Sequence, residues 1–420
     1  MNRREFLAGM GAAALPAPRK PNIVIILADD LGYGDLACYG GRNPTPHLDA
    51  LARGGVRFTD FHSNGAVCSP TRAALMTGRY QQRCGITEVI AAAGPRDQGL
   101  DPAAQTAFPS LLRKAGYRTA MFGKWHLGYQ PRFNPVHHGF DEFRGYVSGN
   151  VDYFSHVDQA GHADWWNGDR LAPEEGYTTE LVTRHGVRFI ESNRERPFLL
   201  YLAHEAVHYP YQGPDGKPQR VAGQAPPRDP KQDVAPVYRQ MLGAMDSGVG
   251  RVMDTLRRLG LERDTFVFFF SDNGATQAGS NAPLRGFKSS VWEGGHRIPA
   301  IAYWPGRVPA GKVSAQTGIG MDLFATLLEI SGAPAAPRKL DGTSLMPILT
   351  AETPRTLFWG HGPQRAVRDG DWKLVLMPEA EPFLANLRAD PGERTNLAAA
   401  ESARVARMRE MLAAWERDVQ

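Results

Sequence analysis

The chain of 420 residues is long enough for one large domain or two unequal ones, and its 42% hydrophobic and 22% charged residues are typical of a globular protein. The formal net charge is +4, of which residues 1–20 carry +3, so that only +1 remains for residues 21–420. This near balance argues against a nucleic-acid partner. Three cysteines are too few for a disulfide scaffold.

The first 20 residues have the pattern of an export signal. The stretch "MNRREFLAGMGAAALPAP" carries paired arginines, then Phe6-Leu7, then a weakly apolar run that ends in small residues and proline. This is typical of a twin-arginine signal, so we expect a periplasmic or secreted protein. The alternative is an N-terminal helix of the fold. No segment reaches the ~18 uninterrupted apolar residues of a membrane span, and none is expected.

Strands and helices alternate over residues 21–349. Four apolar runs stop abruptly at charged or imidazole side chains: "NIVIILADD", "YRTAMFGKWHLG", "PFLLYLAHEAVHYP" and "DTFVFFFSDNG". Continuous hydrophobicity is typical of strands buried on both faces, as in a parallel sheet. Helical patterns lie between them, at 47–55, 108–116, 178–192 and 238–260. We therefore predict an α/β domain with a large, mostly parallel mixed sheet sandwiched by helices.

The pattern changes near residue 350. Short alternating runs, "RTLFWG", "RAVRDG" and "DWKLVLM", predict antiparallel strands joined by turns such as Asp369-Gly370. The stretch "ESARVARMREMLAAWERDV" predicts a final helix. We interpret residues 350–420 as a small subdomain made of an antiparallel sheet and one helix.

Ionisable groups end the four predicted parallel strands. Asp29 and Asp30 follow the first strand, and Asp272 and Asn273 follow the last. Either pair alone is more often a turn or a helix cap. Ligands of such folds lie beyond the carboxyl ends of the strands, so the pairs together predict a convergent site. Three carboxylates and an amide suit Ca²⁺, or Mg²⁺, better than zinc.

Cys68 begins an apparent helix in "CSPTRAALMTG". Pro70 suits a first helical turn, and Gly78 suits a helix end. Cys68 would then lie at the helix N-terminus, which favours anions, with the cationic Arg72 on nearly the same face. Two interpretations compete: a buried thiol that packs like a small hydrophobe, or a residue used for chemistry.

The stretch "CSPTRAALMTGR" resembles the signature of the type I sulfatases, Cys-x-Pro-x-Arg followed by Thr-Gly-Arg. Further stretches resemble blocks of that family in its order, and the resemblance covers residues 21 to 397. They are "PNIVIILADDLGYGDLACYG", "TPHLDALARGGVRFTDFH", "GYRTAMFGKWHLG", "FSDNG", "GFKSSVWEGGHRIP", "LDGTSLMPIL" and "RDGDWKL…DPGERTNL". The resemblance implies an alkaline-phosphatase-like fold and hydrolysis of sulfate monoesters, on a sulfated carbohydrate or an aryl sulfate.

The resemblance also implies roles for matching residues. A maturation enzyme would oxidise Cys68 to Cα-formylglycine, whose hydrate is the nucleophile. Its two hydroxyls would serve in turn, one to attack sulfur and the other to expel sulfate once its proton is removed. The implied metal ligands, for Ca²⁺ in most relatives, are Asp29, Asp30, Asp272, Asn273 and the modified residue 68. The implied reacting side chains are Arg72 and Lys124, which orient and polarise the hydrate, His126 as base, and His208 with Lys288 at the sulfate and the leaving oxygen.

Other residues have plainer interpretations. We expect His204 to be structural or to support the site, Arg297 to brace its loop, and Cys38 and Cys84 to be free thiols. Trp165-Trp166 could form a wall for a sugar, although aromatic pairs are more often simply packed. Two other functions stay open at this point: a phosphonate or phosphate monoester hydrolase on the same scaffold, and a non-catalytic binding protein.

Overall fold

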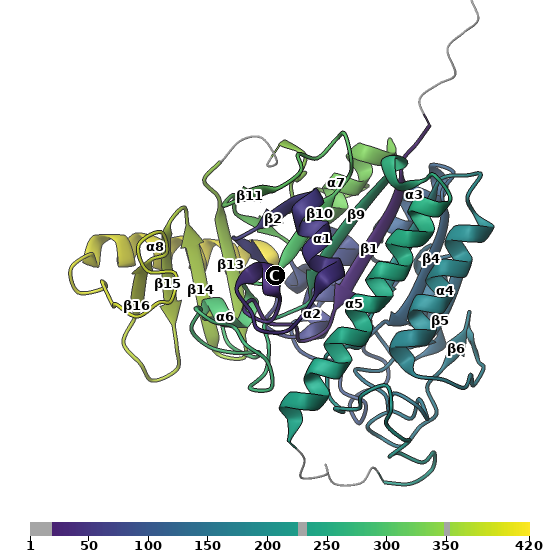
Figure 1. Ribbon diagram of the computed structural model, residues 1–420. Helices are drawn as coiled ribbons and strands as arrows, with labels where there is room; N and C mark the ends of the chain where they lie inside the picture. Colours follow the sequence, from purple (N-terminus) through teal and green to yellow (C-terminus); the bar gives the residue numbers. More distant parts are fainter. Residues whose placement is uncertain (1–18, 226–232, 348–352) are drawn as a thin grey trace, which may run out of the picture.

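A ten-stranded sheet runs through the centre of the computed structural model, which describes residues 19–225, 233–347 and 353–420 (Figure 1). Most of the predicted export signal and the predicted boundary at residues 349–350 lie outside the described residues. In spatial order the strands are β11 (Lys312–Ser314), β2 (Val56–Phe58), β10 (Ala300–Tyr303), β9 (Thr265–Ser271), β1 (Asn22–Ala28), β8 (Phe198–Ala203), β4 (Arg118–Lys124), β5 (Glu142–Tyr146), β6 (Trp166–Asn167) and β7 (Arg170–Leu171).

The middle of the sheet is parallel. Strands β9, β1, β8, β4 and β5 pair in parallel, while β10 is antiparallel to both β9 and β2. All seven residues of β1 and of β9 are buried, as continuous apolar runs require of strands covered on both faces. The predicted mixed, mostly parallel sheet is confirmed, and the carboxyl ends of four predicted strands meet at one edge.

Helices cover both faces of the sheet (Figure 1). Because side chains alternate across a strand, Ile23, Ile25 and Leu27 pack on one side and Val24 and Ile26 on the other. The first side holds α2 (Cys68–Thr77), α3 (Phe108–Lys114) and α7 (Asp322–Ser331), and the second holds α1 (Pro46–Gly54), α4 (Thr178–Ser192) and α5 (Val234–Arg258). The predicted helices α1, α3, α4 and α5 are confirmed within a few residues.

A separate four-stranded antiparallel sheet lies beside the large one, drawn in yellow-green at the left of Figure 1. Its strands are β13 (Thr356–His361), β14 (Gln364–Asp369), β15 (Trp372–Leu376) and β16 (Phe383–Asn386), and α8 (Ser402–Val419) packs on them. Three strands and the helix match the prediction. An apolar cluster that includes Trp359, Val291 and Met321 joins this sheet to the rest of the chain.

Three further short elements complete the architecture. Strands β3 (Phe61–His62) and β12 (Gly318–Ile319) form a two-stranded sheet, and α6 (Glu293–His296) is a single helical turn. Among the residues described, no helix combines the length and the apolar character that crossing a membrane would need.

Candidate active site

The sequence-predicted site residues converge at the carboxyl edge of β1, β4, β8 and β9. Asp29 and Asp30 follow β1, Lys124 ends β4, and Asp272 follows β9. His126 lies two residues beyond β4, and His208 lies in the loop after β8. Helix α2 brings Cys68 and Arg72 to the same edge, and the loop before α6 brings Lys288.

Helix α2 presents Cys68 as its first residue. Val67, just before it, is extended, and Gly78 ends the helix in a left-handed conformation with φ of 67°. The Cys68 thiol is buried, 3.6 Å from Asp29 Oδ1 and 3.5 Å from the Lys288 ammonium. Burial, reinforced by the Asp29 carboxylate, raises the pKa of Cys68 to about 12. As an unmodified thiol, residue 68 is therefore neutral at physiological pH.

The acidic residues and Asn273 form hydrogen bonds with one another near the Cys68 thiol. The backbone amide of Asp30 donates to Asp272 Oδ1 at 3.3 Å, and Asn273 Nδ2 donates to Asp30 Oδ1 at 2.7 Å. Asp30 has a φ of 60°, a left-handed conformation that is unfavourable for a residue other than glycine. Asn273 Oδ1 is buried without a hydrogen-bond partner in the described part of the chain. A buried, unsatisfied amide oxygen beside carboxylates suits a hard cation.

His208 lies beside the predicted metal ligands, although it was not predicted to be one of them. One potential ligand atom from each of Asp29, Asp30, Cys68 and His208 lies within 4.8 Å of the other three. His208 Nε2 is 3.7 Å from Asp30 Oδ2. The two residues are far apart in the sequence, and the parallel pairing of β1 with β8 brings the loops that carry them together, as the convergent strand ends predict.

Three cations balance the three aspartates. Arg72 donates to Asp272 Oδ2 through Nη2 at 2.8 Å and to the Lys124 carbonyl through Nη1 at 2.8 Å. Lys124 forms an ion pair with Asp29, and Lys288 Nζ lies 2.6 Å from Asp30 Oδ1.

These ion pairs set the charge states of the lysines. Burial alone would lower the pKa of Lys124, but the Asp29 carboxylate and the neighbouring acidic groups together outweigh burial and hold that pKa above its usual value. Burial also opposes the charge of Lys288, but Asp30 and the neighbouring acidic groups together hold its pKa well above the ordinary lysine value. Both lysines therefore carry their charge in the folded protein.

Two histidines of the predicted site are neutral bases. His126 Nε2 donates to the Ile90 carbonyl at 3.1 Å, which leaves Nδ1 unprotonated and without a partner among the described residues. Burial, then Lys124 and Arg72, hold the pKa of His126 well below its usual value. Burial, followed by Lys288, lowers the pKa of His208 to about 3. His208 Nδ1 donates to the Tyr209 carbonyl at 2.5 Å, so Nε2 is the nitrogen near Asp30.

The remaining candidates lie away from the reacting groups. Arg297 bonds the Thr59 carbonyl and Glu293, so it braces its loop as expected. Trp165 is buried against the His156 ring at 4.4 Å, and it therefore offers no face to a sugar. His204 is buried, and burial lowers its pKa to about 4. All three cysteines of the chain are described, and they are free.

Sequence reasoning missed Glu205. This fully buried carboxyl accepts a hydrogen bond from the Val151 amide at 2.8 Å, and burial raises its pKa well above the usual value. Lys124 and Asp29 both act electrostatically on it, which places it behind the catalytic edge. Its position between His204 and the predicted site residue His208 in "AHEAVH" was the available signal.

Comparisons with known proteins agree with this geometry. The family model described as Sulfatase matches residues 21–333. N-acetylgalactosamine-6-sulfatase of Canis lupus familiaris is 38% identical over an alignment of 386 positions, which covers 84% of this chain and 71% of that protein. Arylsulfatase A of Homo sapiens is 34% identical and covers 92% of this chain and 85% of its own length.

Solved structures show the same architecture. The crystal structure of Ps i-CgsB in complex with k-i-k-neocarrahexaose has a TM-score of 0.87 and 30% identity, and covers 96% of this chain and 94% of that one. The phosphonate monoester hydrolase of Agrobacterium radiobacter, at a TM-score of 0.68 and 21% identity, shares the fold, with 96% of each chain covered.

Proposed function

Because the chain belongs to the sulfatase family and is a sulfuric ester hydrolase, we propose that the convergent residues around Cys68 carry this reaction on a sulfated saccharide. The observation that carries the proposal is the single buried cluster in which Cys68 contacts both Asp29 and Lys288. The saccharide class is suggested by two similar proteins, one named for N-acetylgalactosamine 6-sulfate and one bound to k-i-k-neocarrahexaose.

The proposed metal ligands are Asp29, Asp30, Asp272, Asn273 and residue 68. Their oxygens suit Ca²⁺, with Mg²⁺ as the alternative, and the unsatisfied Asn273 Oδ1 fits such a site. His208 also lies within the cluster, but nitrogen is a poor ligand for these hard cations. A bound cation would supply positive charge to sulfate oxygens at the point where negative charge builds up.

Residue 68 is proposed to act after conversion to formylglycine by a maturation enzyme. The hydrated aldehyde would then supply two hydroxyls, one for attack on sulfur and one for release of sulfate. Arg72 fixes this end of α2 by bonding Asp272 and the Lys124 backbone. Lys124 stays charged beside Asp29, so it can orient the hydroxyls and neutralise a developing oxyanion.

The proposed proton transfers use the histidine and lysine atoms that face the cluster. His126 would accept a proton at its unpartnered Nδ1, because Nε2–H is engaged with Ile90. Lys288 keeps its charge and would donate to the leaving oxygen. His208 would bind the sulfate through Nε2 as an imidazolium, because Nδ1–H is held by Tyr209 and Nε2 can donate only when it is protonated too; the negative charge of the sulfate favours that form.

The remaining proposals concern the whole chain. We propose that residues 1–20 direct twin-arginine export to the periplasm or the exterior. We also propose that residues 21–349 are the catalytic domain and residues 350–420 a C-terminal subdomain. The four-stranded sheet begins at Thr356 and is followed by α8, which supports that division.

Two measurements test the proposed function. Peptide mass mapping of active protein should find formylglycine at position 68, and a panel of sulfated mono- and disaccharides should release sulfate. Paired aryl sulfate and aryl phosphate esters test the alternative, and we expect the sulfate to react faster. Full turnover by protein whose residue 68 is an unmodified thiol would contradict the mechanism.

A further inference from the structure

The tip of the β13–β14 hairpin, residues 361–364, touches the loop that carries Lys288. Gln364 Nε2 donates to the Ser289 carbonyl at 3.0 Å, and the Val291 amide donates to Gln364 Oε1 at 3.3 Å. One side-chain amide thus bonds two backbone groups directly after Lys288. Gln364 belongs to the small C-terminal sheet, far along the chain from the residues it holds.

The backbone at this point needs support. Ser289 has a φ of 68°, a left-handed conformation that a residue with a side chain adopts only when its surroundings impose it. The large domain supplies two anchors: the Lys288 amide donates to the Ala275 carbonyl, and the Ser289 amide donates to the Ala66 carbonyl at 2.9 Å. Gln364 supplies the third anchor, at the Ser289 carbonyl. This turn directs the Lys288 ammonium to Asp30 and Cys68.

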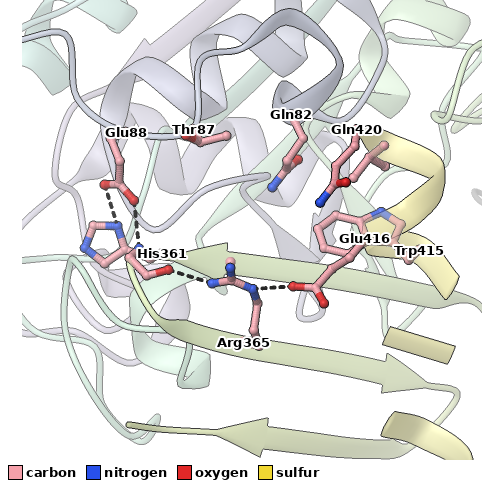
Figure 2. Close-up of a pocket in the computed structure, with 11 residues that line it drawn as sticks. Gln82, Thr87, Glu88, His361, Arg365, Trp415, Glu416 and Gln420 are labelled. Carbon is pink, nitrogen blue, oxygen red and sulfur yellow. Dashed lines mark hydrogen bonds and ion pairs between the residues drawn. The ribbon is translucent and has the colours of Figure 1, made fainter. Parts of the chain in front are cut away.

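The same tip holds a second loop of the site. Glu88 accepts from the Gly362 amide at 2.7 Å, and its other oxygen lies 3.1 Å from His361 Nδ1 (Figure 2). Two residues after Glu88, the Ile90 carbonyl accepts from His126. The tip therefore bonds to both loops, and it borders a cavity of about 300 Å³ between the Glu88 loop and α8 (Figure 2).

We propose that Gln364 is a positioning residue for Lys288. By fixing the Ser289 turn, it would keep the Lys288 ammonium where the leaving oxygen of the ester develops its charge. The inference rests on the proposed role of Lys288 as donor to that oxygen. Through Gln364 the C-terminal sheet would take part in the reaction, although Gln364 itself touches no reacting atom.

The test is the dependence of kcat/KM on leaving-group pKa, measured with a series of aryl sulfates. A misplaced donor matters most for poor leaving groups, because these need protonation most. For Gln364→Ala we expect a loss about ten-fold greater with the poorest leaving group than with the best. Gln364→Glu keeps an acceptor for the Val291 amide but places a carboxylate oxygen against the Ser289 carbonyl. It should therefore show the same change in leaving-group dependence as Gln364→Ala. A loss of folded protein would instead lower the apparent kcat/KM by the same factor for every substrate.

Arg365 provides the matched control on the same strand. Its guanidinium pairs with Glu416 of α8 and bonds the backbone carbonyls of Gly362 and Gln364, so it supports the hairpin backbone but not the Gln364 side-chain amide that contacts Ser289 and Val291 (Figure 2). Arg365→Met should change stability without changing the leaving-group dependence. The inference is overturned if both Gln364 variants keep the wild-type dependence, or if Arg365→Met shifts it equally.

Lys288→Ala separates this inference from the proposed function. It should steepen the leaving-group dependence strongly. If it does, and the Gln364 variants do not, only the positioning role falls. If Lys288→Ala leaves the dependence unchanged, the donor role of Lys288 falls, and the inference falls with it.

Discussion

Lys373 of β15 is fully buried with its ammonium between two buried carboxylates. Nζ lies 2.8 Å from Glu293 Oε1 and 3.0 Å from Glu393 Oε1, and 3.1 Å from His296 Nε2. The contact with Glu293 joins the C-terminal sheet to α6, which follows the Lys288 loop. Replacing Lys373 by methionine removes the cation and leaves two buried carboxyl groups without it, with Arg297 at 3.3 Å from Glu293 as partial compensation.

Breaking a buried ion pair by removing one partner costs about 3–5 kcal/mol, because the remaining charge stays desolvated. We expect Lys373→Met to lower the free energy of unfolding by that amount. Urea unfolding at neutral pH, followed by tryptophan fluorescence, measures the change; Trp359 and Trp372 of this sheet report it directly.

A surface ion pair between α8 and the same sheet is the control. Arg407 Nη2 lies 2.8 Å from Asp369 Oδ2, with the arginine side chain 56% exposed. Exposed pairs contribute about 0–1 kcal/mol, so Arg407→Ala should have little effect. If Lys373→Met costs no more than Arg407→Ala, the reasoning about the buried cluster is wrong.

Three further outcomes are expected. Cys68→Ser keeps one hydroxyl but lacks a second, so it should release at most one equivalent of alcohol and lose more than about 10³-fold in turnover, whereas Cys68→Ala should give no burst in rapid-quench measurements. Asn273→Leu should raise the half-saturating Ca²⁺ concentration at least about ten-fold, read as Ca²⁺-dependent thermal stabilisation. Glu393 has a pKa raised by burial to about 7, so its contribution to stability falls as pH rises from about 4.5 to 7. Between pH 5 and pH 8 the urea midpoint of unfolding should decline less for Glu393→Gln than for the wild type.

The sequence predicted the parts of the fold that local patterns encode. The fully apolar strands β1, β4, β8 and β9 were found because burial on both faces removes polar residues. Their endings located the site, since parallel strands bring their carboxyl ends together. The short strands β6, β7, β11, β12 and β16 have two to four residues each, too few for a period to appear.

The interactions of side chains across the fold could not be predicted in this way. Glu293, Lys373 and Glu393 are far apart in the sequence, and each resembles an ordinary surface charge there. Their burial depends on how the small sheet packs against α6. Gln364 has no distinctive pattern either. For Trp165 the plainer interpretation holds, because its ring is buried against His156, whereas Trp166 is only partly buried.

The charges of the site explain how the fold can hold so many ionised groups and still attract an anion. Asp29, Asp30 and Asp272 are each paired with one of the cations Lys124, Lys288 and Arg72. The buried cluster is therefore neutral before a metal binds, which avoids the cost of an uncompensated buried charge. A divalent cation on the same carboxylates would add two positive charges without removing any of the three side-chain cations. The site would then carry the excess positive charge that a sulfate ester requires, and carry it only when its metal is present.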